Sequence, residues 1–244
     1  MGRLSSGKMP ANVLRRAIKS YIRAYHIDMN QFDIDLKKVK TFNQFFTRPL
    51  KPGMRRFEGQ IAAFSDGFIS AFGPIIDQQL FQVKGSNYLL SELLQEENIF
   101  ISGSFATIYL SPADYHRIHM PFDGTITSIK HIPGKLYSVN KKTVSRISKL
   151  YCRNERTVLS GTSAFGAFHL ILVGAIVVGR IVLSFTDLKP VKGIAIPVNH
   201  SLKQGDELGW FELGSTVVLV MESQHLAELA YHPHQKIQLG NKLV

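Results

Sequence analysis

Three short segments of the sequence combine residue types that can do nucleophilic or acid–base chemistry. The first is Gly214-Ser215-Thr216, which leads into the apolar run 217–220. Ser215 could attack the carbonyl of Gly214 if a base removes its proton, and glycine leaves no Cβ to crowd the attack. The same tripeptide is also typical of a tight turn at the start of a strand.

The second segment is 114–121, which holds His116 and His119 together with Tyr115 and Arg117. Histidine is the usual general base near neutral pH, and one positioned base contributes roughly 10²- to 10⁴-fold in rate. Structural histidines or a pair of metal ligands are the alternatives. A metal is disfavoured, because two histidines need further ligands and the sequence offers no obvious cluster. On a strand the two histidines would face opposite sides, so a shared site requires a turn.

The third segment is Asp66-Gly67, which lies between apolar runs. Such a pair normally forms a hairpin turn. Asp66 would take part in chemistry only by orienting a histidine, as the acidic member of a catalytic triad does. Spacing alone does not show that the two meet.

Short strands must position these segments, because apolar runs alternate with turn signals from residue 61 onward. The runs are 68–72, 80–83, 106–110, 125–130, 157–159, 167–173, 175–183 and 216–221, with a short helix expected at 91–95. We therefore predict an α+β fold that is mostly β. It would have a barrel-sandwich-like antiparallel core with short N-terminal helices.

Residues 1–56 carry most of the net charge of +11: 13 of the 29 Lys and Arg residues lie there, against 3 of the 18 acidic residues. Apolar residues recur at helical spacing over 10–25, while Arg15, Arg16, Lys19 and Arg23 lie largely away from them. Such a helix can lie on anionic lipid, or it can be an ordinary surface helix packed on the protein's own core. We predict a helical membrane-association segment, 1–56, and a β-rich catalytic domain, 57–244.

The single cysteine, Cys152, excludes an intrachain disulfide and fits a reducing, cytoplasmic setting. Neither a signal peptide nor a transmembrane span is expected. The longest apolar stretch, 164–179, is short and is interrupted by His169.

Together the three segments resemble the phosphatidylserine decarboxylase family in their order and rough spacing. The family's Leu-Gly-Ser-Thr processing motif matches 213–216, its Asp-Tyr-His-Arg-x-His-Met-Pro stretch matches 114–121, and its Asp-Gly-x-Ile element matches 66–69. Weaker similarities lie at 42–50, 83–85, 137–140, 153–156 and 172–175.

This resemblance implies a proenzyme that cuts itself between Gly214 and Ser215, giving a 1–214 β chain and a 215–244 α chain that remain associated. His119, oriented by Asp66, would deprotonate Ser215, which would end as a pyruvoyl cofactor. The mature lyase would bind phosphatidylserine as a Schiff base on the pyruvoyl group, release CO₂ and give phosphatidylethanolamine. His116 would assist decarboxylation or protonate the carbanion, and no metal is expected.

The implied partners are phosphatidylserine and an anionic membrane surface, and a homodimer is compatible with the family. The expected location is peripheral, at the cytoplasmic face of the inner membrane. Nucleic acid is not expected, because the basic helical face lacks an aromatic stacking platform.

Two other functions stay open at this point. A serine hydrolase could use Asp66, His119 and Ser215 on an external substrate, with a free hydroxyl and an intact chain. A non-catalytic binding module is the second, because 198–220 resembles the hairpins of lipoyl-carrier folds, although no lysine stands at an evident hairpin tip.

Overall fold

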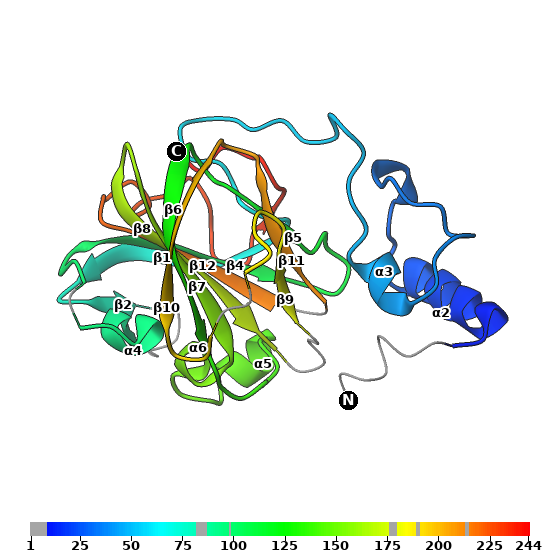
Figure 1. Ribbon diagram of the computed structural model, residues 1–244, viewed down its shortest axis with the longest axis horizontal. Helices are drawn as coiled ribbons and strands as arrows, with labels where there is room; N and C mark the ends of the chain where they lie inside the picture. The colour runs from blue at the N-terminus through cyan, green and yellow to red at the C-terminus, as the bar shows by residue number, and fades with distance from the viewer. Residues whose placement is uncertain (1–8, 82–86, 98, 176–179, 189–190, 213–214) are drawn as a thin grey trace.

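The computed structural model of the protein describes residues 9–81, 87–97, 99–175, 180–188, 191–212 and 215–244. Leu213 and Gly214 of the predicted processing motif therefore lie outside the described residues. Figure 1 shows a β-rich body with two N-terminal helices to one side of it.

Within the described residues, ten strands form one large sheet in which every pairing is antiparallel. Their order is β10-β6-β7-β8-β12-β4-β1-β2-β3, and β13 pairs with β1. The strands are β1 (Gly67–Ile76), β2 (Gln79–Phe81), β3 (Asn87–Leu89), β4 (Gly103–Leu110), β6 (Gly124–Ile132), β7 (Arg156–Ser163), β8 (Gly166–Gly174), β10 (Ala195–Leu202), β12 (Ser215–Met221) and β13 (Lys236–Ile237).

A second, three-stranded sheet has the order β5-β11-β9 and packs on one face of the large sheet. It consists of β5 (Arg117–His119), β9 (Ile181–Leu183) and β11 (Glu207–Phe211). Ile118 and Leu208 from the small sheet share one apolar core with Leu172 and Val217 from the large sheet. The opposite face of the large sheet is covered by a second core that includes α4 (Leu90–Leu94) and α6 (Leu150–Arg153).

Strand β12 is buried on both faces, which explains its unbroken apolar sequence. Val217 and Leu219 belong to the core beneath the small sheet, whereas Val218 and Val220 belong to the opposite core. Because side chains alternate along a strand, Ser215 faces the small sheet.

The other helices in the described ranges are α2 (Ala11–Ala24), η1 (Met29–Gln31), α3 (Phe42–Phe46) and α5 (Lys141–Val144). The apolar face of α2 is buried against the protein, since Leu14 and Ile18 pack with Phe45 of α3. The apolar face of α2 thus packs within the N-terminal segment, and association of residues 1–56 with a membrane stays a prediction. No helix in the described part of the chain is long and apolar enough to cross a membrane.

The mostly β architecture with short N-terminal helices is confirmed, with sheets that are open and face each other. The helix expected at 91–95 is α4. Of the strand expected at 175–183, the structure shows β9 at 181–183, and residues 176–179 lie outside the described residues. The hairpin interpretation of 198–220 is wrong: β10 pairs with β6 whereas β11 pairs with β5 and β9, so the two strands belong to different sheets.

Candidate active site

One end of the large sheet brings the three predicted segments together. Ser215 is the first residue of β12 and aligns with Leu110, the last residue of β4. Asp66 immediately precedes β1, which pairs with the same end of β4 through Phe68 and Tyr109. The chain that leaves β4 at Leu110 continues directly into the segment with both histidines. The topology therefore gathers residues that are far apart in the sequence.

Ser215 is 0% exposed, and its Oγ has no hydrogen-bond partner among the described residues. A buried polar group without a partner costs roughly 1–3 kcal/mol. Native proteins hold few such groups, and reaction sites are one place where they persist.

His116 is buried as a neutral imidazole with a free basic nitrogen. Its Nδ1 lies 2.8 Å from the carbonyl oxygen of Asp114, which can only accept, so Nδ1 carries the hydrogen and Nε2 holds the lone pair. Nε2 has no partner among the described residues, and the ring centroid lies 4.2 Å from that of Phe46. Burial lowers the pKa of His116 to about 3, so the ring is neutral at pH 7.

His119 has the same tautomer but a different partner on its basic nitrogen. Nδ1 lies 2.8 Å from the carbonyl oxygen of Gly205, while Nε2 lies 3.1 Å from the hydroxyl of Tyr115. Burial lowers the pKa of His119, although the Gly205 carbonyl and the charge of Glu207 oppose this effect. A neutral ring with a basic Nε2 is the form that a general base requires.

The carboxylate of Asp66 is held by two groups other than a histidine. Arg55 Nη2 donates to Oδ2 at 2.9 Å, and the backbone N–H of Leu239 donates to Oδ1 at 2.7 Å. The negative charge of Asp66 is near enough to act on His119, where it favours a higher pKa. Asp66 thus influences the His119 ring through its electric field, and the triad hydrogen bond between them stays a prediction.

A cavity of about 130 Å³ adjoins this ion pair; it is lined by Arg55, Asp66, Asp114 and Tyr115 together with residues of the N-terminal segment. A larger cavity, of about 430 Å³, lies between β9 and the ends of β6 and β7. Thr157 lines the larger cavity and pairs with Leu172, whose side chain belongs to the core on the Ser215 face of the sheet.

Comparison with known proteins identifies the family. The family model for phosphatidylserine decarboxylase matches residues 42–244. The chain belongs to the phosphatidylserine decarboxylase family. The matched range contains Asp66, His116, His119 and Ser215, and it begins after α2.

Several phosphatidylserine decarboxylase proenzymes are similar over most of their length. The protein of Variovorax paradoxus is 40% identical, and the alignment covers 98% of this chain and 89% of the relative. The protein of Acinetobacter baylyi is 39% identical, with coverage of 95% and 86%. That of Idiomarina loihiensis is 44% identical, with coverage of 83% and 75%. The resemblance drawn from the motifs is confirmed.

The N-terminal part of this decarboxylase-family chain supports the histidine segment. Arg48, 1% exposed, donates to the carbonyls of Phe46 and Ala113, and its guanidinium lies 4.2 Å from the ring centroid of Phe32. The Tyr21 hydroxyl of α2 donates to the Pro112 carbonyl at 2.6 Å. Residues of the basic N-terminal segment 1–56 therefore hydrogen-bond directly to the loop that leads into both histidines.

Arg117, between the two histidines, makes a further link. Its Nε donates to the Thr47 carbonyl at 2.9 Å, and its Nη1 donates to Glu207 at 2.8 Å. Glu207 pairs with His119 across β11 and β5. The arginine thus joins the N-terminal segment to the strand opposite His119.

The sequence carries no pattern that marks Arg55, Gly205 or Leu239 as parts of the site. Arg55 is one of several basic residues in its segment, and the other two contribute only backbone groups. No spacing pattern connects them to Asp66 or His119. The sequence could have indicated Arg48, because this residue lies in the family-like stretch 42–50.

Proposed function

We propose that this chain is a self-processing phosphatidylserine decarboxylase that cuts itself between Gly214 and Ser215. The observation that carries the proposal is the complete burial of Ser215, whose Oγ has no partner in the described part of the chain, inside the family's processing motif. A serine hydrolase would have to present this hydroxyl to an external substrate in the uncut chain, whereas the proposed decarboxylase needs substrate access to residue 215 only after the cut. A serine that attacks its own backbone needs no such access.

In the proposed maturation, Ser215 Oγ attacks the carbonyl carbon of residue 214. The O–C bond forms, the C–N bond to Ser215 breaks, and the hydroxyl proton passes through the base to the freed amine. Loss of the Cα proton of residue 215 then expels the carboxylate of residue 214 and leaves dehydroalanine. Its imine tautomer takes up water and releases ammonia, which leaves the pyruvoyl group.

We assign the base to His119, because its ring is neutral and its Nε2 holds a lone pair. The Tyr115 hydroxyl occupies that lone pair, so the base must act through Tyr115 or release it. Asp66 is assigned to stabilise the His119 imidazolium that forms when the proton is taken up.

The site fits a group derived from Ser215. The residue is enclosed, and its cross-strand neighbour on β8 is Gly174, which places no side chain opposite it. When present, the pyruvoyl group supplies an electron-withdrawing carbonyl that accepts the substrate amine and the electrons left as CO₂ departs. His116, whose buried Nε2 has no partner among the residues that the structure describes, is assigned to hold and deliver the proton that replaces CO₂. Among the described residues no group of three or more side chains could hold a metal ion.

The two chains produced by the cut would remain associated. The 215–244 part contains β12, which pairs with β8 on one side and with β4 on the other. All seven residues of β12 are buried. The α chain would thus keep its place inside the sheet without the peptide bond to residue 214.

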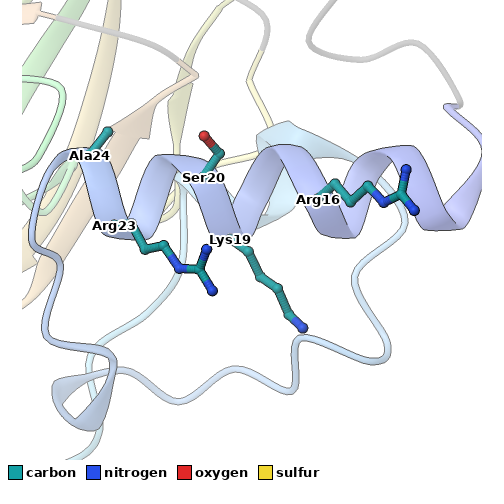
Figure 2. A pocket seen from close by; sticks show the side chains of 5 residues that line it. All are labelled: Arg16, Lys19, Ser20, Arg23 and Ala24. Atoms are coloured by element: carbon teal, nitrogen blue, oxygen red, sulfur yellow. The ribbon is translucent and has the colours of Figure 1, made fainter.

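A lipid substrate requires contact with a membrane surface, and α2 offers a basic face for it. Arg16, Lys19 and Arg23 line a shallow hollow on this helix, and Lys19 and Arg23 extend from the same side (Figure 2). The apolar face of α2 is already used inside the protein. We therefore propose electrostatic attachment to anionic lipid, at the cytoplasmic face of the membrane, rather than insertion of the helix.

Intact mass under denaturing conditions tests the cleavage. Wild-type protein should give chains of about 24 and about 3.4 kDa, in proportion to 214 and 30 residues of the 27.4 kDa chain, and the smaller should begin with a pyruvoyl group. Ser215→Ala should stay uncut, while Ser223→Ala, which removes another buried hydroxyl without a partner in the described ranges, should process normally. A wild-type chain that stays at 27.4 kDa even with anionic lipid would overturn the proposal.

A further inference from the structure

We infer that Asn154 is a positioning residue for self-cleavage at Ser215. Its side chain is 0% exposed and makes three hydrogen bonds. Nδ2 donates to the carbonyls of Gly174 at 2.7 Å and Tyr137 at 2.8 Å, while Oδ1 accepts from the Tyr137 N–H at 3.0 Å. These residues come from the family-like stretches 137–140, 153–156 and 172–175, to which the proposed chemistry gives no other role.

The contact to Gly174 matters because Gly174 is the direct partner of Ser215 on β8. The Gly174 N–H donates to the Glu155 carbonyl at 2.8 Å, and the Gly174 carbonyl accepts from Asn154. Both polar groups of Gly174 therefore point toward residues 154–155 and away from β12. This makes Ser215 and Gly174 a non-hydrogen-bonded pair, in which Cα atoms approach to about 4.5 Å and side chains lie on one face.

Asn154 thus fixes the backbone that lies nearest to Ser215 on the β8 side. Without its amide, the Gly174 carbonyl would be a buried acceptor that has lost its partner. The Ser215 hydroxyl, unpaired among the described residues, is a donor on the adjacent strand. A Gly174 carbonyl freed from Asn154 could turn toward β12 and accept from Ser215. That bond would draw the hydroxyl away from the carbonyl of residue 214, which it must attack.

The backbone of Asn154 is held in place by hydrogen bonds on both sides. Its backbone N–H donates to Leu150 at the start of α6, and its carbonyl accepts from Arg156 Nη1 at 2.9 Å. Arg156 is 0% exposed and also binds the carbonyls of Glu92 and Leu93 in α4. The positioning contact is therefore anchored in two helices on the face opposite the small sheet.

The inference rests on the proposed self-cleavage, and the test separates the two. Precursor made by cell-free synthesis is followed by intact mass, and hydroxylamine is added to trap the ester that precedes chain separation. The variant Asn154→Ala removes all three side-chain hydrogen bonds. Asn154→Asp keeps the shape of the side chain and the acceptor for the Tyr137 N–H, but at pH 8 it loses the donor to the Gly174 carbonyl. If Asn154→Ala does not fold, the cleavage rate of Asn154→Asp tests the inference.

Two controls exclude a merely structural role. Phe105→Leu weakens the core at the end of β4 away from Ser215, where Phe105 pairs with Val220. The cleavage rates of Phe105→Leu and of the Asn154 variants are compared where the two lower the thermal midpoint equally. Asn140→Ala removes an exposed amide that caps α5 and does not touch β8. Both controls should form ester and cut at the wild-type rate.

We expect both Asn154 variants to form ester and cut more slowly by about tenfold or more, since small misplacements of reacting groups carry large rate penalties. Cleavage of the Asn154 variants at the rate of Phe105→Leu, at equal thermal midpoint, would overturn the inference and leave the proposed function standing. Wild-type precursor that never forms ester would overturn the proposed function instead.

Discussion

Asp66 and Arg55 form a nearly buried ion pair at the edge of the site: Arg55 Nη2 lies 2.9 Å from Asp66 Oδ2, and the side chains of Arg55 and Asp66 are only 10% and 12% exposed. Arg55 belongs to the link between the N-terminal helices and β1. The second carboxylate oxygen binds the N–H of Leu239, beyond the proposed cut. Asp66 therefore ties together the linker, the β chain and the α chain.

Breaking this pair from one side should destabilise the protein strongly. In the uncut Ser215→Ala background, Arg55→Leu should lower the free energy of unfolding by about 3 kcal/mol, because it leaves a buried carboxylate without its partner. The double variant Arg55→Leu/Asp66→Asn should recover part of the loss, since no charge remains. Urea unfolding measures both.

The exposed pair Lys203–Asp123 is the control. The Lys203 and Asp123 side chains are 80% and 61% exposed, so water screens the pair and Lys203→Leu should destabilise the protein far less than Arg55→Leu. If Arg55→Leu costs no more than Lys203→Leu, the pair does not stabilise the site.

The two histidines should separate maturation from decarboxylation. His119→Ala should stay largely uncut, because loss of a general base slows the reaction by roughly 10²- to 10⁴-fold. His116→Ala should cut into two chains but release CO₂ poorly from phosphatidylserine in mixed micelles. Intact mass and CO₂ release are measured on the same preparations.

His200→Ala, which alters a half-buried histidine of β10, is the matched control and should leave both steps unchanged. A fully processed His119→Ala would contradict the assignment of the base. An uncut His116→Ala would move His116 into the maturation step.

Stability should fall as the pH drops below 6.5, because His116 is buried as a neutral ring. The unfolded chain takes up a proton at the ordinary pKa of about 6.5, whereas burial lowers the pKa in the folded protein to about 3. Between these values the unfolded state binds more protons, so stability is present above pH 6.5 and is lost on acidification. The loss is about 1.4 kcal/mol per pH unit for each such group.

Urea unfolding of Ser215→Ala at pH 7, 6, 5 and 4 measures this slope. His116→Phe should make it shallower, and His232→Phe, which alters an exposed ring, should not. Burial also lowers the pKa of His169, to about 4, so a slope from that group should persist in His116→Phe. Equal slopes for Ser215→Ala and for Ser215→Ala/His116→Phe would contradict the prediction.

Attachment to anionic vesicles should depend on the exposed basic face of α2. Lys19→Glu/Arg23→Glu should weaken binding to phosphatidylserine-containing vesicles by at least about tenfold, since each basic residue near such a surface contributes about 1 kcal/mol. High salt should reduce the difference, because it screens exposed charges. Vesicle co-sedimentation at low and high salt measures both effects.

Arg146→Glu/Lys242→Glu makes the same change in net charge on exposed residues of the β-rich part. It should weaken binding much less. Equal weakening by the two pairs would show that net charge, and not the α2 face, governs attachment.

The sequence by itself determined the family, the positions that could react and the main elements. Ser215, His116, His119 and Asp66 stand in motifs whose residue types limit the chemistry. The apolar runs led to β4, β6, β8 and β12, because buried strands carry continuous or alternating apolar residues that can be read without a structure. Helical spacing likewise indicated α2.

Tertiary structure decided which partners these residues have. Gly205 and Leu239 take part through backbone groups, which no side-chain pattern reveals. Whether α2 buries its apolar face in lipid or in protein could not be read from its periodicity, since both surroundings favour the same pattern. The structure shows that Leu14 and Ile18 of this face pack against Phe45.

The register of the large sheet was equally invisible in the sequence. Runs of valine and leucine show that a strand is buried but not which residue it faces, because one apolar partner is nearly as good as another. The fold alone places Gly174 beside Ser215 and Asn154 behind Gly174. The sequence therefore determined what can react, and long-range backbone pairing decided what holds it in place.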